Sequence, residues 1–391
     1  MPPQVVVLGS GYAGAGAIPV LEDELDGADL VWISDVDYHL VLHESHRVIR
    51  DPSVREKITV PVADIKSPDT EFRQGTVTGV DVEERVVELA DGDTVDYDYL
   101  LVGIGSRTAF FGIDGLAENA LTLKSLDDAL AIHDAVRSAA SDATRADPAT
   151  VVVGGAGLSG IQSAGEIAAF RDEHNAPIDV SLVEGLDNVF PPGDPDVQGR
   201  VRQLLEDADV EIMTGEFINE VDDDRVYVGE DTELGYDVLL WTGGITGRDA
   251  TADADLDKDE RDRRLFAGQD FRTSDDRVFA VGDTAHVDQS DDGEAPPTAV
   301  AAWDAARVAA HNVGNAVRGQ PLETWTYEDK GTLISVGDDA IAHQVKLPVA
   351  GRLPVRTFGA APARFLKKAA AARWITSITS LPRAMAAWDA L

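Results

Sequence analysis

The feature that most constrains this chain is a glycine-rich turn that directly follows a short apolar run. In residues 5–14, the run Val5–Leu8 precedes glycines in the order G-x-G-x-x-G. A continuous run with three valines is typical of a strand buried on both faces, and residues 15–25 are compatible with a helix. Glycines allow a tight turn, close approach of a pyrophosphate to the backbone, and close packing of helix on strand. The pattern therefore predicts a dinucleotide at the N-terminus of that helix.

A second copy of the same pattern lies in residues 150–160. Its helix is expected to continue to about Glu173, and the next strand, Val180–Val183, ends in Glu184. In a dinucleotide-binding unit, an acid at this position accepts the ribose hydroxyls. Residues 185–188 contain no lysine or arginine that could accept a 2′-phosphate. The second copy therefore favours NAD over NADP.

In the first copy, the corresponding strand is predicted over Leu30–Ser34. The position of the ribose-binding acid then offers Ser34 and Asp35, of which Asp35 is the better chemical candidate although it lies at or beyond the end of the strand. The segment that follows is rich in imidazole and could suggest a metal site, but no further cluster of ligands supports it. Its polar residues are Tyr38, His39, His43, Glu44 and His46.

The two halves of the chain also resemble each other beyond the glycine turns. Each acid-ended strand is followed by short strands, then by Tyr-Asp-x-Leu-Leu and a pair of glycines, at residues 97–105 and 236–244. A helix is expected over residues 125–143 between the halves. An internal repeat at this scale indicates two dinucleotide-binding domains of one design.

After the second copy, the acidic residues 249–264 are predicted to form an exposed loop. A strand over residues 277–281 then ends in Gly282-Asp283, and a helix is expected over residues 299–317. Asp283 could simply cap a turn. A carboxylate at the carboxyl end of a strand could instead accept hydrogen bonds from cofactor hydroxyls, and we favour this second interpretation.

Charge and composition exclude several classes of function. The chain has 33 lysines and arginines against 71 aspartates and glutamates, a formal net charge of −38, which disfavours nucleic-acid binding. Such an excess is typical of adaptation to high salt, where screening weakens self-repulsion. The absence of cysteine excludes disulfides and thiolate metal sites. No apolar run approaches the roughly 18 residues of a membrane span, and the first strand leaves no room for a signal peptide, so we expect a cytoplasmic protein.

The C-terminal tail reverses the sign of the charge. From residue 346 onward, eight basic residues stand against one acid, Asp389. This pattern favours docking on an anionic membrane surface; the alternatives are docking on the chain's own acidic surface or on a second subunit of a homodimer. The apolar residues 365, 366, 375 and 378 do not share one helical arc. The basic residues are Lys346, Arg352, Arg356, Arg364, Lys367, Lys368, Arg373 and Arg383.

Together these motifs resemble the FAD- and NAD(P)-linked two-domain flavoprotein reductases, and within them the type II NADH:quinone dehydrogenases. The narrower resemblance rests on residues 38–40, 105–112, 160–166, 278–283 and 327–333. It implies an α/β fold with two Rossmann-like domains, each with a β-meander insertion. The FAD domain would be discontinuous, over 1–112 and 265–340, with the NAD domain over 113–264 and a basic tail over 341–391.

The resemblance also implies ligands and roles: hydride passes from NADH to FAD, and electrons pass to a quinone or a similar acceptor. The helix that begins near Pro297 would point its positive end at the flavin. The residues implied for FAD are Gly9, Gly11, Tyr12, Ala13, Gly14, Ser34, Asp35, Val77, Gly103, Ile104, Gly105, Arg107, Gly282 and Asp283. Those implied for NADH are Gly155, Gly157, Leu158, Ser159, Gly160, Glu184, Gly243 and Gly244. The catalytic candidates are Gln162, Glu166 and Lys330, and no metal is expected.

The sequence departs from the family pattern at three places. Gln162 replaces the usual glutamate near the nicotinamide, Ser34 replaces the usual first-domain acid, and residues 299–304 lack the two glutamines of the quinone site. Glutamine can hydrogen-bond but cannot act as an acid. Two alternatives therefore stay open: a soluble NADH:acceptor reductase that serves a small redox protein, and a non-catalytic sensor that binds FAD and NAD.

Overall fold

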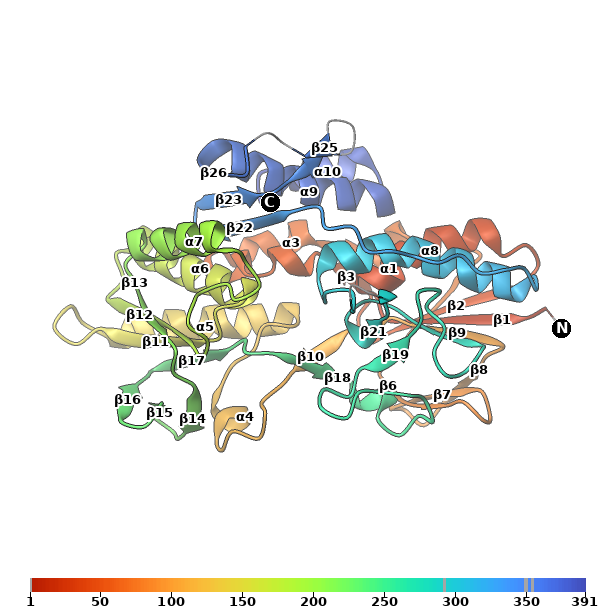
Figure 1. Ribbon diagram of the computed structural model, residues 1–391, viewed down its shortest axis with the longest axis horizontal. Coiled ribbons are helices and arrows are strands. Elements are labelled where there is room, and N and C mark those ends of the chain that lie inside the picture. The colour runs from red at the N-terminus through yellow and green to blue at the C-terminus, as the bar shows by residue number, and fades with distance from the viewer. Residues whose placement is uncertain (1, 291–292, 348–350, 353–354) are drawn as a thin grey trace.

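The structure is a computed structural model that describes residues 2–290, 293–347, 351–352 and 355–391. Figure 1 shows two α/β lobes side by side and a third layer, built from the C-terminal residues, that lies across both. The α/β fold class that the sequence predicts is confirmed, with one parallel sheet in each lobe.

The first lobe is organised around a five-stranded sheet in the order β20-β9-β1-β2-β5, in which every pair is parallel. Helices α1 and α8 pack together over one face of this sheet, and the residues Val5–Leu8 of its central strand are fully buried. Strand β20 comes from the second half of the chain, so the sheet is built from two distant segments. The elements are β1 (Gln4–Leu8), α1 (Tyr12–Glu24), β2 (Asp29–Ser34), β5 (Glu71–Gln74), β9 (Tyr99–Val102), β20 (Val278–Ala280) and α8 (Ala299–Val317).

The second lobe repeats this plan with a four-stranded parallel sheet in the order β13-β12-β11-β17. Helix α5 contacts β11 and β17, α6 contacts β11, β12 and β13, and α7 contacts β13. The elements are α5 (Leu126–Asp142), β11 (Ala149–Gly154), α6 (Leu158–His174), β12 (Ile178–Glu184), α7 (Pro195–Asp207), β13 (Val210–Thr214) and β17 (Val238–Trp241).

Each lobe also carries the predicted antiparallel meander, β6-β7-β8 in the first and β14-β15-β16 in the second. The meander strands are β6 (Val77–Asp81), β7 (Val86–Leu89), β8 (Thr94–Asp96), β14 (Ile218–Val221), β15 (Arg225–Val228) and β16 (Thr232–Gly235). The lobes are joined by the antiparallel pair β10 (Ser106–Thr108) and β18 (Ile245–Gly247), where the chain crosses between them twice.

Short elements fill the edges of both lobes. The pair β19-β21 is parallel and the pair β3-β4 is antiparallel. Helix α2 contacts α5 and α6 of the second lobe, so the insertion after β2 bridges the two lobes. These elements are β3 (Tyr38–Leu40), α2 (Arg47–Arg50), α3 (Arg55–Ile58), β4 (Thr59–Pro61), α4 (Leu116–Asn119), β19 (Leu265–Ala267) and β21 (Ala285–Val287), with 3-10 turns η1 (Leu42–Glu44), η2 (Pro52–Val54), η3 (Val62–Asp64), η4 (Asp249–Thr251) and η5 (Gly282–Thr284).

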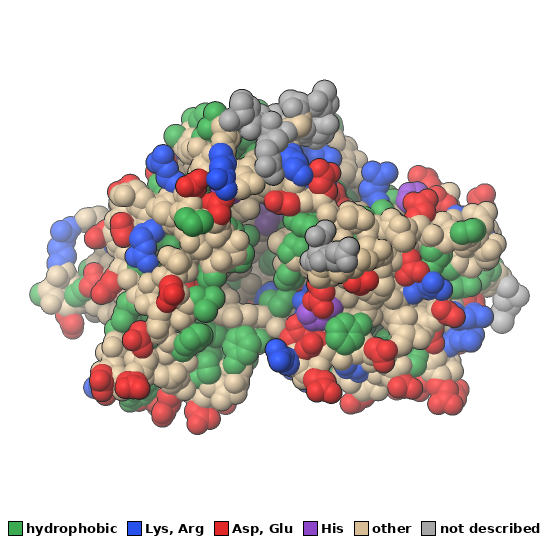
Figure 2. All heavy atoms as spheres, in the orientation of Figure 1, with side chains coloured by type: hydrophobic (Ala, Val, Ile, Leu, Met, Phe, Trp, Pro, Cys, Tyr) green, Lys and Arg blue, Asp and Glu red, His purple; other side chains and the backbone are tan. Residues whose placement is uncertain are grey.

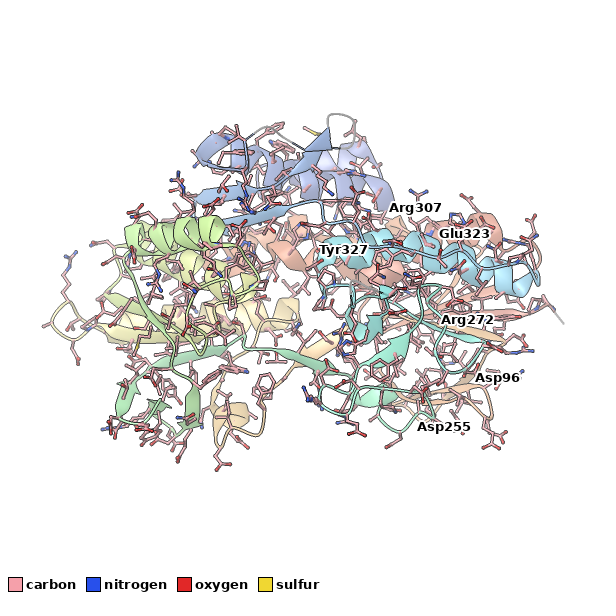
Figure 3. The ribbon with its side chains drawn as sticks, in the orientation of Figure 1. Asp96, Asp255, Arg272, Arg307, Glu323 and Tyr327 are labelled. Atoms are coloured by element: carbon pink, nitrogen blue, oxygen red, sulfur yellow. The ribbon has the colours of Figure 1, made fainter. Side chains whose placement is uncertain are left out.

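An extended segment leads from α8 to the third layer. The backbone N–H of Trp325 donates to the Gln269 carbonyl at 2.9 Å, and that of Tyr327, labelled in Figure 3, donates to Gln289 Oε1 at 2.6 Å. These contacts fix the chain along the first lobe before it crosses to β22.

The third layer is an antiparallel sheet, β22-β23-β26, with helix α9 packed on it and α10 beside α9. It contacts α6 and α7 of the second lobe and α1 and α3 of the first. The boundary expected between residues 340 and 341 falls inside β23, so we propose a C-terminal unit that begins at β22. Its elements are β22 (Thr332–Val336), β23 (Asp339–His343), β24 (Lys346–Leu347), β25 (Gly351–Arg352), β26 (Thr357–Gly359), α9 (Ala360–Ile378) and α10 (Leu381–Ala387).

The acidic segment 249–264 is irregular, as predicted, but it is not wholly exposed. Ala254 and Leu256 are buried, and Lys258 Nζ donates to the carbonyls of Thr251, Ala252 and Ala254 at 2.7–2.9 Å. Backbone carbonyls that converge on one ammonium group order this loop without regular secondary structure.

Carboxylates are scattered over the face of the molecule shown in Figure 2 rather than gathered in one patch, and the surface is hollowed between the two lobes. Among the described residues, no helix is long and apolar enough to span a bilayer.

Candidate dinucleotide-binding site

The two glycine turns have the same geometry. Gly9 and Gly155, which directly follow β1 and β11, both have φ of +93°, in the left-handed region that favours glycine. A Cβ added at Gly14 or Gly160 would overlap the carbonyl oxygen of Gly9 or Gly155, respectively. Glycine at these four positions is therefore required by the turn itself and by the packing of α1 and α6 on it.

The middle glycines differ from their neighbours because they face open space. A Cβ added at Gly11 or Gly157 meets no described heavy atom within 4 Å. Each is the N-cap of its helix, and in the described structure no side chain caps either helix start and no acid occupies either first turn. Free N–H groups, the helix dipole and an uncovered backbone together form a cradle for an anion such as a pyrophosphate.

The acid of the second turn is anchored at this cradle. Glu184, the last residue of β12, accepts hydrogen bonds from the backbone N–H groups of Ala156 at 2.7 Å and Leu186 at 3.0 Å. The carboxylate is only half-buried, so part of it remains open beside the glycine turn. Leu158 and Ser159, which were also assigned to this site, form the first turn of α6.

The first turn holds a hydroxyl pair at the same place. Ser34, the last residue of β2, is buried and donates from Oγ to Ser10 Oγ at 2.9 Å. Asp35 is exposed, one residue beyond the strand, and its Oδ1 lies 3.4 Å from Ser34 Oγ. Ser34 is therefore directed toward the turn, and Asp35 lies at its rim.

The third glycine segment meets Asp283 at the carboxyl ends of β9 and β20. The Gly105 N–H donates to Thr284 Oγ1 at 2.8 Å, and Ser106 Oγ donates to Asp283 Oδ2 at 3.3 Å. A Cβ at Gly103 would lie 2.9 Å from the Cβ of Ala13, so this segment packs directly on the first turn. The structure thus brings the glycine segments at residues 9–14 and 103–105 close to each other and to Asp283.

Two cations near Asp283 were missed by the sequence analysis. Lys124 Nζ donates to Ser106 Oγ at 3.2 Å, and burial lowers the pKa of Lys124. Arg264 is buried and donates to the carbonyls of Asp283 at 2.9 Å and Ala285 at 2.6 Å. Both residues are far from the glycine motifs in the sequence and belong to no recognisable motif. The sequence therefore gave no indication that they lie near Asp283.

Four residues assigned to the first site have other contacts. Arg107 lies in β10 and donates from Nη1 to Asp249 Oδ2 at 2.7 Å, at the crossing between the lobes. Val77 begins the meander strand β6 and packs against the core. Tyr12 is buried, and its hydroxyl hydrogen-bonds to His43 Nδ1. The partly buried Ile104 also packs against the core.

The glycine pair that follows β17 has a packing role. A Cβ at Gly243 would overlap the ring of Trp241, and a Cβ at Gly244 would lie 2.5 Å from the ring of Phe111. Phe111 is 68% exposed. The buried ring of Trp241 accounts for Gly243 apart from any ligand, whereas the exposed ring of Phe111 can turn away and does not require glycine at position 244.

The catalytic candidates fall into two groups. Gln162 and Glu166 are buried one helical turn apart on α6, and Gln162 Nε2 donates to Ser335 Oγ at 3.0 Å and lies 3.2 Å from His46 Nε2. Lys330 instead forms an ion pair with Asp304 of α8. The partners His46 and Ser335 come from distant segments, and the sequence did not connect them to Gln162.

The histidine-rich segment does not converge on one point. His39 Nδ1 hydrogen-bonds to the Ser10 carbonyl at 2.8 Å, and its Nε2 accepts from Trp374 Nε1 at 2.7 Å. His46 lies 3.2 Å from Ser335 Oγ. Burial lowers the pKa values of His39 and His43 to about 4, so these rings are neutral hydrogen-bonding groups at neutral pH.

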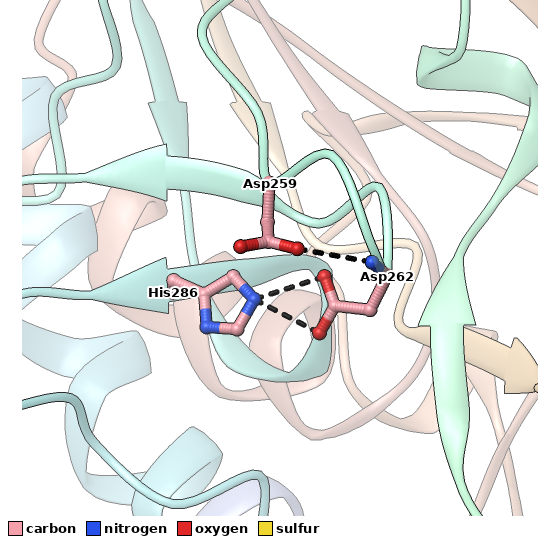
Figure 4. Close-up of side chains that lie close together, drawn as sticks. All are labelled: Asp259, Asp262 and His286. Carbon is pink, nitrogen blue, oxygen red and sulfur yellow. Dashed lines mark hydrogen bonds and ion pairs between the residues drawn. The ribbon is translucent and has the colours of Figure 1, made fainter.

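A separate cluster of ligand-type atoms lies where the loop before β19 meets β21. Asp259, Asp262 and His286 place such atoms within 4.8 Å of one another, as Figure 4 shows. His286 Nε2 hydrogen-bonds to Asp262 at 2.9 Å, and Arg264 Nη1 lies 3.8 Å from Asp262 Oδ2. Because this cluster already holds a guanidinium, we interpret it as a salt-bridge group that fixes the loop.

Much of the basic tail docks on the body of the same chain. Lys367 of α9 is buried against Glu44, with Nζ 2.6 Å from Oε1, and Lys346 pairs with Glu328 at 3.1 Å. Arg356 pairs with Asp194, and Arg373 lies over the ring of Trp303 at 5.3 Å. The side chain of Arg352 is outside the described residues. Four exposed apolar side chains also lie here, Val355, Phe365, Leu381 and Met385.

The comparisons with known proteins agree with this geometry. Residues 3–306 match the family model described as pyridine nucleotide-disulphide oxidoreductase. The type II NADH:quinone oxidoreductase of Staphylococcus saprophyticus is 27% identical over 356 residues, covering 85% of this chain and 87% of the relative. The protein of the same name from Staphylococcus aureus is 25% identical over 377 residues, covering 89% and 91%.

Solved structures share the whole fold. NDH2 from Plasmodium falciparum in complex with NADH has a TM-score of 0.82 at 16% identity and covers 100% of this chain and 98% of its own. The sulfide:quinone oxidoreductase of Aquifex aeolicus has a TM-score of 0.79 at 18% identity and covers 97% and 92%. At these identities the likeness concerns the fold alone.

Proposed function

Since this chain belongs to the pyridine nucleotide-disulphide oxidoreductase family, we propose that it is an FAD-dependent NADH dehydrogenase that passes electrons to a quinone or a similar acceptor. The observation that carries the proposal is the pair of matched cradles at Gly11 and Gly157, one in each lobe, with the same open face. Two dinucleotides held at the carboxyl ends of two parallel sheets are the arrangement that hydride transfer between them requires.

The residues around the first cradle fit FAD, and those around the second fit NADH. The turn at Gly9–Gly14 would hold the FAD pyrophosphate, with Asp35 at the ribose and Asp283 at the ribityl hydroxyls. When bound, FAD supplies a hydride acceptor for the nicotinamide of NADH. The N-terminus of α8, where Thr298 accepts from the Ala301 N–H at 3.2 Å, would place its positive end near the flavin.

Glu184 supports the choice of NADH over NADPH. Its carboxylate is fixed beside the second cradle by Ala156 and Leu186, where it can accept hydrogen bonds from both ribose hydroxyls. A 2′-phosphate at the same place would meet a negative charge instead.

The acceptor side of the site departs from the family. Trp303 and Asp304 stand where the quinone-site pattern is expected, and Asp304 is paired with Lys330. Trp303 packs against Trp374 of α9, with ring centroids 4.9 Å apart. A quinone bound here would therefore contact an aromatic ring and charged side chains, and not the two glutamine amides of the family pattern. This observation keeps the soluble NADH:acceptor reductase as the second candidate.

We also propose that the C-terminal unit docks on an anionic membrane surface. Its exposed Phe365, Leu381 and Met385 each lie within two residues of an arginine in the sequence, and apolar side chains next to cations suit a lipid interface. Salt-reversible binding to anionic vesicles, weakened when all three are replaced by serine, would support this docking; unchanged binding would refute it. A homodimer stays an alternative use of the same surface.

Anaerobic mixing with NADH tests the main proposal. The flavin absorbance of the purified holoprotein is expected to bleach within one turnover and to recover when a quinone analogue is added. A flavin that does not bleach would refute both enzymatic candidates and leave the non-catalytic sensor. Recovery with a small redox protein but not with a quinone analogue would select the second candidate.

A further inference from the structure

The two glycine turns differ in what holds the peptide that precedes the middle glycine. In the second turn, the carbonyl of Ala156 accepts a hydrogen bond from the backbone N–H of Phe190 at 2.8 Å, within the same lobe. In the first turn the equivalent carbonyl is that of Ser10, and it lies 2.8 Å from Nδ1 of His39. The first turn therefore uses a histidine side chain where the second uses a backbone donor.

A neutral imidazole can hold this carbonyl in only one of its two tautomers. To donate to Ser10, Nδ1 must carry the proton, and Nε2 is then an acceptor. The indole N–H of Trp374 is a donor only, and it lies 2.7 Å from Nε2 of His39. Trp374 therefore selects the tautomer in which Nδ1 donates to the Ser10 carbonyl. His39 is fully buried, and burial lowers its pKa to about 4, so the ring is neutral at neutral pH.

Trp374 reaches this histidine from outside the first lobe. It is buried on α9 of the C-terminal unit, which contacts α1, and it lies 335 residues from His39 in the sequence. Gly16 in the middle of α1 leaves room for it, because a Cβ there would lie 3.2 Å from the Trp374 ring and 2.9 Å from the Cβ of Ala306. The ring of Tyr12, the first residue of α1, also packs on Trp374, with centroids 5.1 Å apart. The C-terminal unit thus contacts the start of α1 and, through His39, the turn before it.

The direction of the Gly11 N–H follows from that of the Ser10 carbonyl. In a planar trans peptide the C=O and the next N–H point in opposite directions. A carbonyl that is held by His39 therefore fixes the Gly11 N–H on the other side of the peptide. A Cβ added at Gly11 would meet no described heavy atom within 4 Å, so this residue lies at the open face of the first cradle. Backbone N–H groups at a helix start are the donors that a pyrophosphate accepts from.

We propose that Trp374 is a positioning residue for FAD, which acts through His39 and not on the cofactor itself. By selecting the tautomer of His39, it fixes the peptide between Ser10 and Gly11 so that the Gly11 N–H is directed at the pyrophosphate. The C-terminal unit thereby sets how tightly the first lobe retains FAD. The second cradle is independent of this contact, because its equivalent peptide is held by a backbone N–H. This inference rests on the proposed function, since it takes the ligand of the first cradle to be FAD.

The test compares Trp374→Phe with Trp325→Phe, both as full-length holoproteins. The first variant keeps an aromatic ring on α9 but removes the N–H that faces His39. The second makes the same change at another buried tryptophan, whose ring packs on Phe271. Ultrafiltration at several protein concentrations separates free from bound flavin and gives the dissociation constant of FAD. Nitrogen NMR spectra of histidine-labelled protein report which nitrogen of His39 carries the proton. His39→Phe, alone and combined with Trp374→Phe, completes a double-mutant cycle.

For Trp374→Phe we expect the dissociation constant of FAD to rise about tenfold, the effect of one net hydrogen bond, and part of the His39 proton to move to Nε2. Trp325→Phe should change this constant by less than about twofold and leave the proton on Nδ1. The double variant should bind FAD no more weakly than His39→Phe alone, because both changes break one chain of hydrogen bonds. The dissociation constant of NADH should stay within about twofold in every variant.

Three results would overturn the proposal: a proton that stays wholly on Nδ1 in Trp374→Phe, an FAD affinity equal to that of Trp325→Phe, or effects that multiply in the double variant. An equal loss of affinity for FAD and NADH would also overturn it, because such a loss indicates weakened packing of the whole protein. FAD that the unmodified protein binds but that NADH does not reduce would instead refute the proposed enzyme. Failure of the unmodified protein to bind FAD would refute both.

Discussion

Replacing Gly157 by alanine isolates the interaction between the second cradle and its ligand. At this residue φ is −74° and ψ is −176°, a conformation that alanine adopts without strain. The added methyl group meets no described heavy atom within 4 Å. The stability of the folded protein should therefore change by less than about 1 kcal/mol, because alanine restricts the unfolded chain but is less favourable than glycine at the N-cap of a helix.

The same methyl group would occupy the face that a pyrophosphate must approach. Overpacking of this kind costs typically about 1–3 kcal/mol, and each 1.4 kcal/mol is a factor of about ten in affinity. The dissociation constant of NADH should therefore rise roughly 5- to 150-fold, with little change in thermal stability. The dependence of the flavin-bleaching rate on NADH concentration measures this constant directly.

Two matched variants control this experiment. Gly11→Ala makes the same change at the first cradle, so it should weaken retention of FAD and leave the second cradle intact. Gly160→Ala adds a methyl that would overlap the Gly155 carbonyl oxygen and lie 2.7 Å from Thr242 Oγ1, so it should lower the unfolding temperature. If Gly157→Ala changes NADH affinity by less than about twofold, the open face does not hold the pyrophosphate, and the assignment of the second lobe is wrong.

Two further variants test charge. Glu184→Gln should raise the ratio of kcat/KM for NADPH to that for NADH by about tenfold, since it removes a negative charge beside the 2′-position; an unchanged ratio would show that Glu184 does not face the ribose. Lys367→Met should lower the free energy of unfolding by about 3–5 kcal/mol, because Glu44 is left buried with Arg47 alone, whereas the neighbouring Lys368→Met should change it by under about 1 kcal/mol. Lys367 and Arg47 hold the pKa of Glu44 well below its usual range against the effect of burial, so the stabilisation is present above about pH 4.3 and the difference between variant and parent should shrink as the pH falls below that. Calorimetric scans at several pH values check both the size and the sign.

The sequence predicted the two lobes because their determinants are local. Apolar runs followed by G-x-G-x-x-G specify strand, turn and helix within about 20 residues. The helix over residues 299–317, which follows two prolines, was also placed at its observed bounds. The third layer was not predicted as a folded unit. Its helix α9 buries Trp374, Ile375 and Ile378 but also Lys367, so hydrophobic periodicity understates its buried face.

The polar interior was harder to predict because its contacts join distant segments. Lys367 and Glu44 are 323 residues apart, and Gln162 and Ser335 are 173 residues apart. From the sequence alone, a lysine in a basic tail such as Lys367 is expected to be exposed. Only the fold shows that it is buried against the carboxylate of Glu44. The cluster of histidines near residue 40 indicated polar side chains with specific partners. These partners, Ser10, Trp374 and Ser335, could not be inferred from the spacing of the histidines.

The two glycine turns have the same backbone geometry. They differ in the side chain at the end of the next strand, which hydrogen-bonds to the turn. At the end of β12 this side chain is Glu184, whose carboxylate accepts a hydrogen bond from the Ala156 N–H. At the end of β2 it is Ser34, whose hydroxyl donates to the hydroxyl of Ser10. A carboxylate held in place by backbone N–H groups discriminates between a ribose hydroxyl and a phosphate through its charge, whereas a serine pair carries no charge. A substrate that exchanges at every turnover needs such discrimination against its phosphorylated analogue. A resident cofactor is retained by the sum of many contacts, so we expect charge selection at Glu184 and not at Ser34.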